Sequence, residues 1–224
     1  MGLFDSKTKK KQFLVAGLGL FGSSVAITLE KMGFDVLAID SDDEIVQDLS
    51  TQLSYIICAD ASVEKNLNSL ALQDIDVAVV AIGNMERNLM CTMLLKEKGI
   101  PFVVSKALND LHGAMLMKLG ADKVIYAEKD MGKRVAHNLV SSSVMDYIEL
   151  SDEISVMSIA VPEELHGKNL IEANLRKLYN VNVVAIKRDG QTMVNPHAHE
   201  IFQPGDKIIV VGTHTGVKDM GVDF

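Results

Sequence analysis

Six residues near the start of the chain have the types and the spacing of a loop that binds phosphate. Gly17-Leu18-Gly19-Leu20-Phe21-Gly22 follows the pattern G-x-G-x-x-G, between an apolar run at Phe13–Ala16 and a helical pattern from Ser23. In this context the first glycine permits a tight turn, the second lets phosphate approach the backbone, and the third lets helix and strand pack closely. The N–H groups at the start of the helix then attract an anion. The loop therefore predicts a nucleotide-binding site.

An acidic residue lies about 20 residues past the glycines, at the end of the next apolar run. Asp40, followed by Ser41, comes directly after Val36–Ile39. A carboxylate in this place binds both ribose hydroxyls and repels a 2′-phosphate, which disfavours a ligand of the NADP type. The alternative is that Asp40 caps a helix that begins near Asp42.

Two further segments end apolar runs and belong to the same predicted site. Asp60-Ala61 follows the run Tyr55–Cys58, and Ala81-Ile82-Gly83 ends the fourth run. In a parallel sheet the carboxyl ends of the strands lie at one edge, where ligands bind. We therefore expect both segments to line the nucleotide site.

The sequence shows no arrangement that is typical of a catalytic site. The histidines are scattered, and none lies beside an obvious nucleophile or an orienting carboxylate: His112, His137, His166, His197, His199 and His214. We therefore predict no catalytic residues and no enzyme. Two alternatives stay open. One is a small NAD-dependent oxidoreductase, which would need a hydride-acceptor site and an acid or base near the nicotinamide. The other is a free-standing nucleotide sensor.

The spacing of apolar residues predicts an α/β fold. Apolar runs rich in β-branched residues alternate with helical patterns, and several runs are apolar throughout, as strands covered on both faces must be. These repeats predict a Rossmann-type, doubly wound parallel sheet over residues 12–128. The expected strands are Phe13–Ala16, Val36–Ile39, Tyr55–Cys58, Val77–Ile82, Phe102–Ser105 and Lys123–Tyr126. The expected helices are Ser23–Met32, Glu44–Leu53, Val63–Leu70, Glu86–Lys98 and Asp110–Leu119.

The pattern changes after residue 128. Lys129–Met145 fits one helix, with Met131, Val135 and Leu139 on a single stripe, and residues 129–150 are assigned to a crossover helix and linker. Residues 1–11 are predicted to form a disordered leader. Residues 151–224 are predicted to form a small α+β C-terminal subdomain. The expected elements of this subdomain are strands near Val156–Val161, Val181–Lys187 and Lys207–Val211, a helix at Asn169–Leu178, and turns at Asp189-Gly190 and Pro204–Asp206.

Composition excludes several classes of function. The net charge of −8 and the pI near 5.2 argue against a nucleic-acid binder, which would need a basic face, so no nucleic-acid partner is predicted. No apolar run reaches the roughly 18 residues that a membrane span needs. Cys58 and Cys91 show no metal-type spacing and fit a reducing compartment. We expect a cytoplasmic protein that acts at a membrane only through a partner.

Several segments, spread over nearly the whole chain, form one recognisable set: Gly17–Gly22, Asp40, Cys58–Ser62, Ala81–Gly83, Ala121–Gly132, Tyr147–Glu153, Gly167–Leu170, Arg176–Ile186 and Phe202–Asp206. Together they resemble the RCK family, the regulator-of-potassium-conductance subunits of Ktr and Trk transporters. The order of two subdomains joined by a crossover helix is more specific than the glycine pattern.

The resemblance implies a regulatory subunit of the KtrA or TrkA type. Such a subunit would form a homodimer through Lys129–Met145 and assemble into an octameric ring. Its partner would be an integral-membrane potassium channel or transporter subunit, reached from the inner face of the cell membrane. ATP or ADP would bind at the glycine loop, Lys106 would face the phosphates, and Glu128 would help to hold a divalent cation between nucleotides at the dimer interface.

The chain departs from the family pattern at Leu20, where the phosphate loop often carries an arginine. An arginine can pair with a terminal phosphate, and leucine cannot. The choice between ATP or ADP and NAD or NADH therefore stays open.

The resemblance also implies a second ligand. Ktr relatives can bind cyclic di-AMP across the dimer interface of the C-terminal subdomain. The matching positions here are Leu170, Arg176, Asn182, Val183, Pro196 and His197. An arginine suits phosphate, and small apolar side chains suit the faces of adenine. The alternative is that Leu170 and Val183 are ordinary core residues and Arg176 is a solvated charge.

Overall fold

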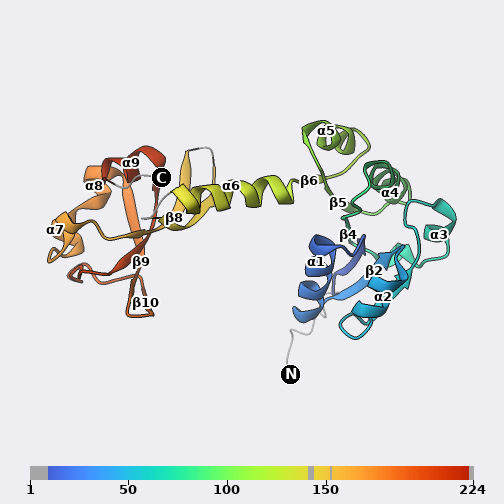
Figure 1. The fold of residues 1–224 in the computed structure, drawn as a ribbon, viewed down its shortest axis with the longest axis horizontal. Helices are drawn as coiled ribbons and strands as arrows, with labels where there is room; N and C mark the ends of the chain where they lie inside the picture. The colour runs from blue at the N-terminus through green and yellow to red at the C-terminus, as the bar shows by residue number, and fades with distance from the viewer. Residues whose placement is uncertain (1–9, 141–143, 152, 222–224) are drawn as a thin grey trace, which may run out of the picture. The chain divides into compact units, whose positions relative to one another are not determined.

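The chain forms two compact units, and the computed structural model describes residues 10–140, 144–151 and 153–221. The first unit ends at Glu128 and the second begins at Lys129. The chain passes from one unit to the other within the helix α6 (Ala127–Val140). Each unit has its own sheet and its own core, and Figure 1 traces both along the chain. Of the expected leader, residues 1–9 lie outside the described residues.

The first unit is built on a six-stranded parallel sheet, as the sequence predicts. The strand order is β3-β2-β1-β4-β5-β6, and every neighbouring pair is parallel. Because β1 and β4 are neighbours without being consecutive, the chain crosses here from one half of the sheet to the other. The strands are β1 (Gln12–Ala16), β2 (Asp35–Asp40), β3 (Tyr55–Cys58), β4 (Val77–Val80), β5 (Phe102–Lys106) and β6 (Lys123–Ile125).

Alternate residues of each strand face opposite sides of this sheet. In β1, Val15 belongs to one apolar cluster, whereas Leu14 and Ala16 belong to another. Side chains of α1 (Leu20–Lys31) and α2 (Asp43–Leu49) complete the first cluster. Helices cover both faces, which explains why the central strands are apolar throughout. The remaining elements are α3 (Glu64–Asn68), α4 (Met85–Glu97), α5 (Asp110–Lys118) and a 3₁₀ turn at Leu72–Asp74.

The second unit is built on a five-stranded antiparallel sheet in the order β10-β9-β11-β8-β7. Alternate residues of β8 and β11 are buried, and Phe202 is among the largest fully buried side chains of the core. The elements are β7 (Val144–Glu149), β8 (Ile154–Ala160), a 3₁₀ turn at Glu163–Leu165, α7 (Leu170–Ala173), α8 (Leu175–Tyr179), β9 (Val181–Arg188), β10 (Gln191–Val194), β11 (Lys207–Thr213) and α9 (His214–Asp219).

The helix expected at Lys129–Met145 is shorter than the sequence predicts. α6 ends at Val140, and Val144 already begins β7, which pairs with β8. Residues 129–150 are therefore more than a helix and a linker, because they supply one strand of the second sheet. The part of the expected helix at 141–143 lies outside the described residues. The mistake arose because a short apolar segment after a helix has no periodicity that separates it from the helix.

The helix expected at Asn169–Leu178 is in fact two short helices. Asn174 lies between them with a left-handed φ of 47°, so α7 ends there and α8 starts at Leu175. Asparagine enters this region more readily than most residues. The strand β10 and the helix α9 were not predicted. The turn at Asp189-Gly190 was predicted from the sequence, and it joins β9 to β10 with both residues at positive φ.

A buried ion pair connects β9 to the turn before β11. The Arg188 guanidinium donates to both oxygens of Asp206 at 2.8 Å and to Glu200 at 3.0 Å. The Asp206 side chain is 0% exposed and that of Arg188 is 26% exposed. The hydrogen bond from Arg188 lowers the pKa of the Asp206 carboxyl. The pair therefore fixes the turn at Pro204-Gly205 against the sheet.

We expect Asp206→Asn to destabilise the second unit, because Arg188 loses the charged partner that is buried beside it. The free energy of unfolding of the full chain should fall by about 3 kcal/mol in urea denaturation near neutral pH. The Asp206 pKa is lowered on folding, so its stabilisation is present above the ordinary value of 3.8. It should disappear as the pH falls through the folded-state pKa.

Asp189→Asn is the matched control, because it removes the same charge from an exposed position beside Arg188, in the turn between β9 and β10. It should change the free energy of unfolding by less than about 0.5 kcal/mol. Equal losses in the two variants would contradict the role of the Arg188–Asp206 pair.

Candidate functional site

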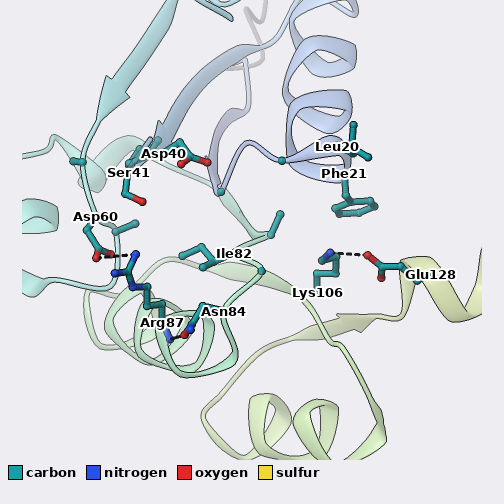
Figure 2. A pocket seen from close by; sticks show the side chains of 17 residues that line it. Leu20, Phe21, Asp40, Ser41, Asp60, Ile82, Asn84, Arg87, Lys106 and Glu128 are labelled. Carbon is teal, nitrogen blue, oxygen red and sulfur yellow. Dashed lines mark hydrogen bonds and ion pairs between the residues drawn. The ribbon is translucent and has the colours of Figure 1, made fainter. Parts of the chain in front are cut away.

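A cavity opens at the carboxyl edge of the parallel sheet, where β1 and β4 become neighbours. Its volume is about 430 Å³, and all of its lining residues belong to the first unit. Figure 2 shows the side chains that line it. They come from the segments that follow β1, β2, β3 and β4, from the ends of β2 and β5, and from the first turns of α1, α4 and α6. Ligands of open α/β sheets bind in crevices at this edge.

The glycine loop makes the tight turn that its sequence predicts. Gly17 has φ +89°, and a Cβ there would lie 2.7 Å from the backbone N of Ile82. A Cβ on Gly22 would lie 1.8 Å from the carbonyl oxygen of Gly17, so strand and helix approach too closely for a side chain. Gly19 lines the cavity, and a Cβ there would meet nothing within 4 Å. Because α1 begins at Leu20, the free N–H groups of its first turn lie at this loop.

Asp40 supports the glycine loop and also lines the cavity. Its Oδ2 accepts a hydrogen bond from the N–H of Leu18 at 2.5 Å, and its Oδ1 accepts one from the N–H of Asp42 at 3.0 Å. The cap of α2 is Asp42, whose side chain accepts from the backbone N–H of Glu44 and Ile45. The alternative interpretation, that Asp40 caps this helix, is therefore wrong. A carboxylate has about four acceptor positions, so Asp40 keeps capacity for ribose hydroxyls.

Lys106 and Glu128 form an ion pair at one end of the cavity, beside Leu20 and Phe21 (Figure 2). Lys106 Nζ lies 2.7 Å from Glu128 Oε1, and the Lys106 side chain is only 11% exposed. The hydrogen bond from Lys106 lowers the pKa of the Glu128 carboxyl. Leu20 is 96% exposed and brings no charge, so the ammonium of Lys106 is the cation that this end offers to a ligand.

Asp60 and Arg87 form a second ion pair, at the other end of the cavity (Figure 2). Their nitrogen and oxygen atoms lie 3.6 Å apart. The Asp60 carboxylate also accepts hydrogen bonds from the hydroxyl of Ser62 at 2.6 Å and from its N–H at 2.9 Å. The Ser62 hydroxyl is the main reason why the pKa of Asp60 is lowered, and Arg87 adds to the effect. The cavity therefore has a carboxylate–cation pair at each end.

Asn88 connects two parts of the cavity wall through their backbones. It is fully buried, and its side-chain amide donates to the carbonyl oxygens of Ile82 at 3.0 Å and of Lys106 at 3.2 Å. One turn further along α4, the hydroxyls of Thr92 and Ser105 are 2.8 Å apart and hydrogen-bonded. The helix α4 therefore fixes the end of β5, from which Lys106 reaches the cavity.

Nearly all residues predicted for the nucleotide site line this one cavity: Gly17, Gly19, Leu20, Phe21, Asp40, Ser41, Asp60, Ala61, Ala81, Ile82, Gly83 and Lys106. Glu128, which was predicted as a metal ligand, lines it as well. Gly22 does not, because it is buried against Gly17. Four further lining residues were not predicted: Ile39, Ala59, Asn84 and Arg87. Asn84 had a readable signal, since its side chain caps α4 just after the segment Ala81–Gly83. That these residues bind a nucleotide stays a prediction.

A second cavity, of about 420 Å³, lies in the second unit beside α7, α8 and the start of β9. Among its lining residues are Leu170, Arg176, Asn182, Val183 and Pro196, all matched to a second ligand. The exposed His197 does not line it. The guanidinium of Arg176 donates to Asn182 Oδ1 at 2.7 Å. Leu170 and Val183 also pack against the core of this unit, so both interpretations of them have a structural basis.

We expect Gly22→Ala to destabilise the first unit, because the added methyl would overlap the Gly17 carbonyl oxygen at 1.8 Å. Forcing the backbones of β1 and α1 apart should cost about 1–3 kcal/mol of the free energy of unfolding. Gly19→Ala is the control, because its Cβ meets nothing within 4 Å. It should cost no more than about 1 kcal/mol, as expected for alanine at a helix N-cap. Urea denaturation of the two variants tests the contact, and equal stabilities would disprove it.

Comparison with known proteins identifies both units. The family model described as the TrkA-N domain matches residues 13–127, and that of the TrkA-C domain matches residues 156–221. Ktr system potassium uptake protein C of Bacillus subtilis (strain 168) is 40% identical over 93% of this chain and 95% of the relative. Ktr system potassium uptake protein A of the same organism is 37% identical over 95% and 96% of the two chains.

Solved structures of lower identity share the fold. The GsuK channel bound to NAD has a TM-score of 0.52 and 20% identity, over 95% of this chain and 38% of that chain. GsuK bound to ADP has a TM-score of 0.50 and 20% identity, over 60% and 35% of the two chains. The glycine loop, the two units in this order and the similarity over nearly the full length of its relatives lead to one conclusion: the chain carries a TrkA-N domain followed by a TrkA-C domain and belongs to the RCK family.

Proposed function

We propose that this chain is the regulatory subunit of a potassium transporter and that it binds a nucleotide in the cavity of the first unit. Two relatives named as Ktr potassium uptake proteins match it at 40% and 37% identity over nearly their whole length. The observation that best supports nucleotide binding is the glycine loop, where Gly19 leaves open space beside the first turn of α1. The subunit would act at the inner face of the membrane through an integral-membrane partner.

The ligand proposed for this cavity is ATP or ADP, with NAD or NADH as the alternative. Asp40 suits the ribose of any of them, and GsuK has been solved with NAD and with ADP. The terminal phosphate of ATP would have to be held by Lys106, because Leu20 supplies no charge. An anion with two or more charges competes well for an ammonium that a single, 67% exposed carboxylate now holds.

Binding energy would drive regulation without a chemical step. A ligand shifts an equilibrium only by its differential affinity for two states. Here a phosphate that takes Lys106 would release Glu128, which lies in the first turn of α6, the helix in which the second unit begins. The local event is therefore an exchange of partners at Lys106.

The proposal includes a divalent cation at Glu128 and assembly into dimers and an octameric ring. Among the described residues, no group of three or more His, Cys, Asp and Glu side chains is placed to hold a metal ion. The cation would therefore need phosphate oxygens and another subunit as further ligands.

Dimerisation through α6 is supported by the exposed stripe Met131, Val135 and Leu139, which are 52%, 48% and 80% exposed. In the described part of the chain, no helix is long and apolar enough to cross a membrane.

The alternative of a small oxidoreductase is less well supported. The described residues that line the cavity include no histidine, cysteine or tyrosine that could exchange a proton with a substrate. Lys106, Glu128, Asp60 and Arg87 are engaged in ion pairs. Asp40 holds the loop. This set suits binding better than acid–base chemistry.

The second cavity is the proposed site of cyclic di-AMP. Arg176 supplies a guanidinium for phosphate, and Leu170, Val183 and Pro196 supply apolar contacts for adenine. A ligand with two-fold symmetry suits a dimer axis, where each subunit offers the same surface. Arg176 is exposed, and its hydrogen bond to Asn182 at 2.7 Å holds the guanidinium beside another lining residue of the cavity. The guanidinium would therefore be within reach of a phosphate bound there.

Gly19→Asp should abolish nucleotide binding while the chain stays folded. The new side chain has room, and aspartate is a good N-cap, but its charge repels phosphate at the place where the backbone approaches it. Thermal unfolding with and without ATP, ADP or NADH measures the effect. Gly19→Asn, of nearly the same size without the charge, should keep more of the ligand-induced rise in Tm. If Gly19→Asp keeps the full rise, the nucleotide binds elsewhere.

Arg176→Ala should weaken cyclic di-AMP binding to the full chain by about 1.5–3 kcal/mol, the range for hydrogen bonds to charged groups. Calorimetry should give one ligand for two chains and unchanged affinity for ATP, because the nucleotide cavity belongs to the other unit. Lys177→Ala is the control, since Lys177 is exposed and does not line the cavity. If calorimetry of the wild-type dimer detects no heat with cyclic di-AMP, the proposed site is wrong and Arg176 is a solvated charge.

A further inference from the structure

Arg87 brings a positive charge to the cavity from a helix that the glycine pattern does not involve. It lies in the first turn of α4, where its backbone N–H donates to the capping side chain of Asn84 at 3.0 Å. Its guanidinium lies beside Asp60, on the same side as Ser41, whereas Lys106 and Glu128 are on the opposite side of Ile82 (Figure 2). Arg87 and Lys106 therefore mark the two ends of the cavity.

The order of the strands tells which part of a nucleotide reaches Arg87. Phosphates belong at the loop after β1, and the ribose belongs at Asp40, at the end of β2. β3 is the next strand in the same direction, so the base extends toward Asp60. The residues Ile39, Ala59 and Ala61, which lie around this end, are apolar and line the cavity. The guanidinium of Arg87 therefore lies where a base is expected, and away from the phosphates.

The local structure gives Arg87 little reason to be an arginine. A cation in the first turn of a helix is unfavourable, because the N-terminus already carries partial positive charge. The ion pair with Asp60 spans 3.6 Å, and its side chains are 53% and 27% exposed. Exposed pairs of this kind add little stability. Asp60 is also held by Ser62, so it does not depend on Arg87.

We infer that Arg87 determines the base specificity of the cavity by stacking its planar guanidinium on a purine ring. This inference rests on the nucleotide site proposed above and adds the residue that selects the base. Arginine stacks on aromatic faces, and a lysine at the same place would keep the charge but not the plane. Asp60 acts as a positioning residue that holds the guanidinium over the base end. A pyrimidine offers a smaller face, so the contact favours purines.

Calorimetry of the full chain with ATP, ADP, AMP and CTP tests this role. Arg87→Gln should weaken ATP, ADP and AMP by the same factor, about 3- to 30-fold, as expected for the loss of one cation–π contact. CTP should weaken less, so the preference for ATP over CTP falls. Arg87→Lys should lie between wild type and Arg87→Gln. Glu86→Gln, in the same turn but outside the cavity lining, is the control and should bind as wild type does.

Three results would overturn the inference. If the loss of affinity in Arg87→Gln grows from AMP to ATP, Arg87 contacts the phosphates instead of the base. If ATP and CTP lose affinity equally, Arg87 does not select the base. If no nucleotide loses affinity, Arg87 does not contact the ligand. In each of these cases wild type still binds and the proposed nucleotide site stands. If wild type binds none of the four nucleotides, the proposed site itself fails, and the role of Arg87 fails with it.

Discussion

The close contact between Gly17 and Gly22 is the constraint on which the site depends. A Cβ on Gly22 would lie 1.8 Å from the Gly17 carbonyl oxygen, so β1 and α1 can meet at this distance only without side chains. This contact sets where α1 begins, and with it the position of the free N–H groups of its first turn. Asp40 then holds the loop through the N–H of Leu18, which brings the end of β2 to the same place. The predicted ribose position and the predicted phosphate position are therefore fixed together.

The ion pairs at the two ends of the cavity give the proposed regulation a physical basis. Each end has a carboxylate paired with a cation, and each pair has an exposed member: Glu128 at 67% and Arg87 at 53%. Pairs with an exposed member contribute about 0–1 kcal/mol, and a phosphate with two or more negative charges would compete for the same ammonium. A ligand can therefore displace the partner of Lys106 at little cost. Glu128 lies in the first turn of α6, so the proposed change would arise where the chain passes from one unit to the other. No bond needs to be made or broken.

Most of the first unit could be read from the sequence, because helices on both faces of a parallel sheet require strands that are apolar throughout. The glycine loop and Asp40 were readable for a similar reason, since each residue type is imposed by local geometry. Lys106 and Glu128 came only from the family resemblance, as nothing local marks either residue. Arg87 was missed because its guanidinium reaches Asp60 from a helix that follows a different strand. In the second unit, β7 was not predicted, because a strand of this length resembles the end of the helix before it. The break between α7 and α8 was not predicted either, because the segment fits one helix apart from Asn174.

The most direct test of the central claim is calorimetry of the purified protein against ATP, ADP and NADH, followed by chromatography of the recovered ligand. The account predicts saturable binding of at least one of these ligands at one site per chain, with the ligand recovered unchanged after prolonged incubation. Failure of all three to bind would contradict the nucleotide site. Binding followed by hydrolysis or oxidation of the ligand would contradict a regulatory subunit that works by binding alone.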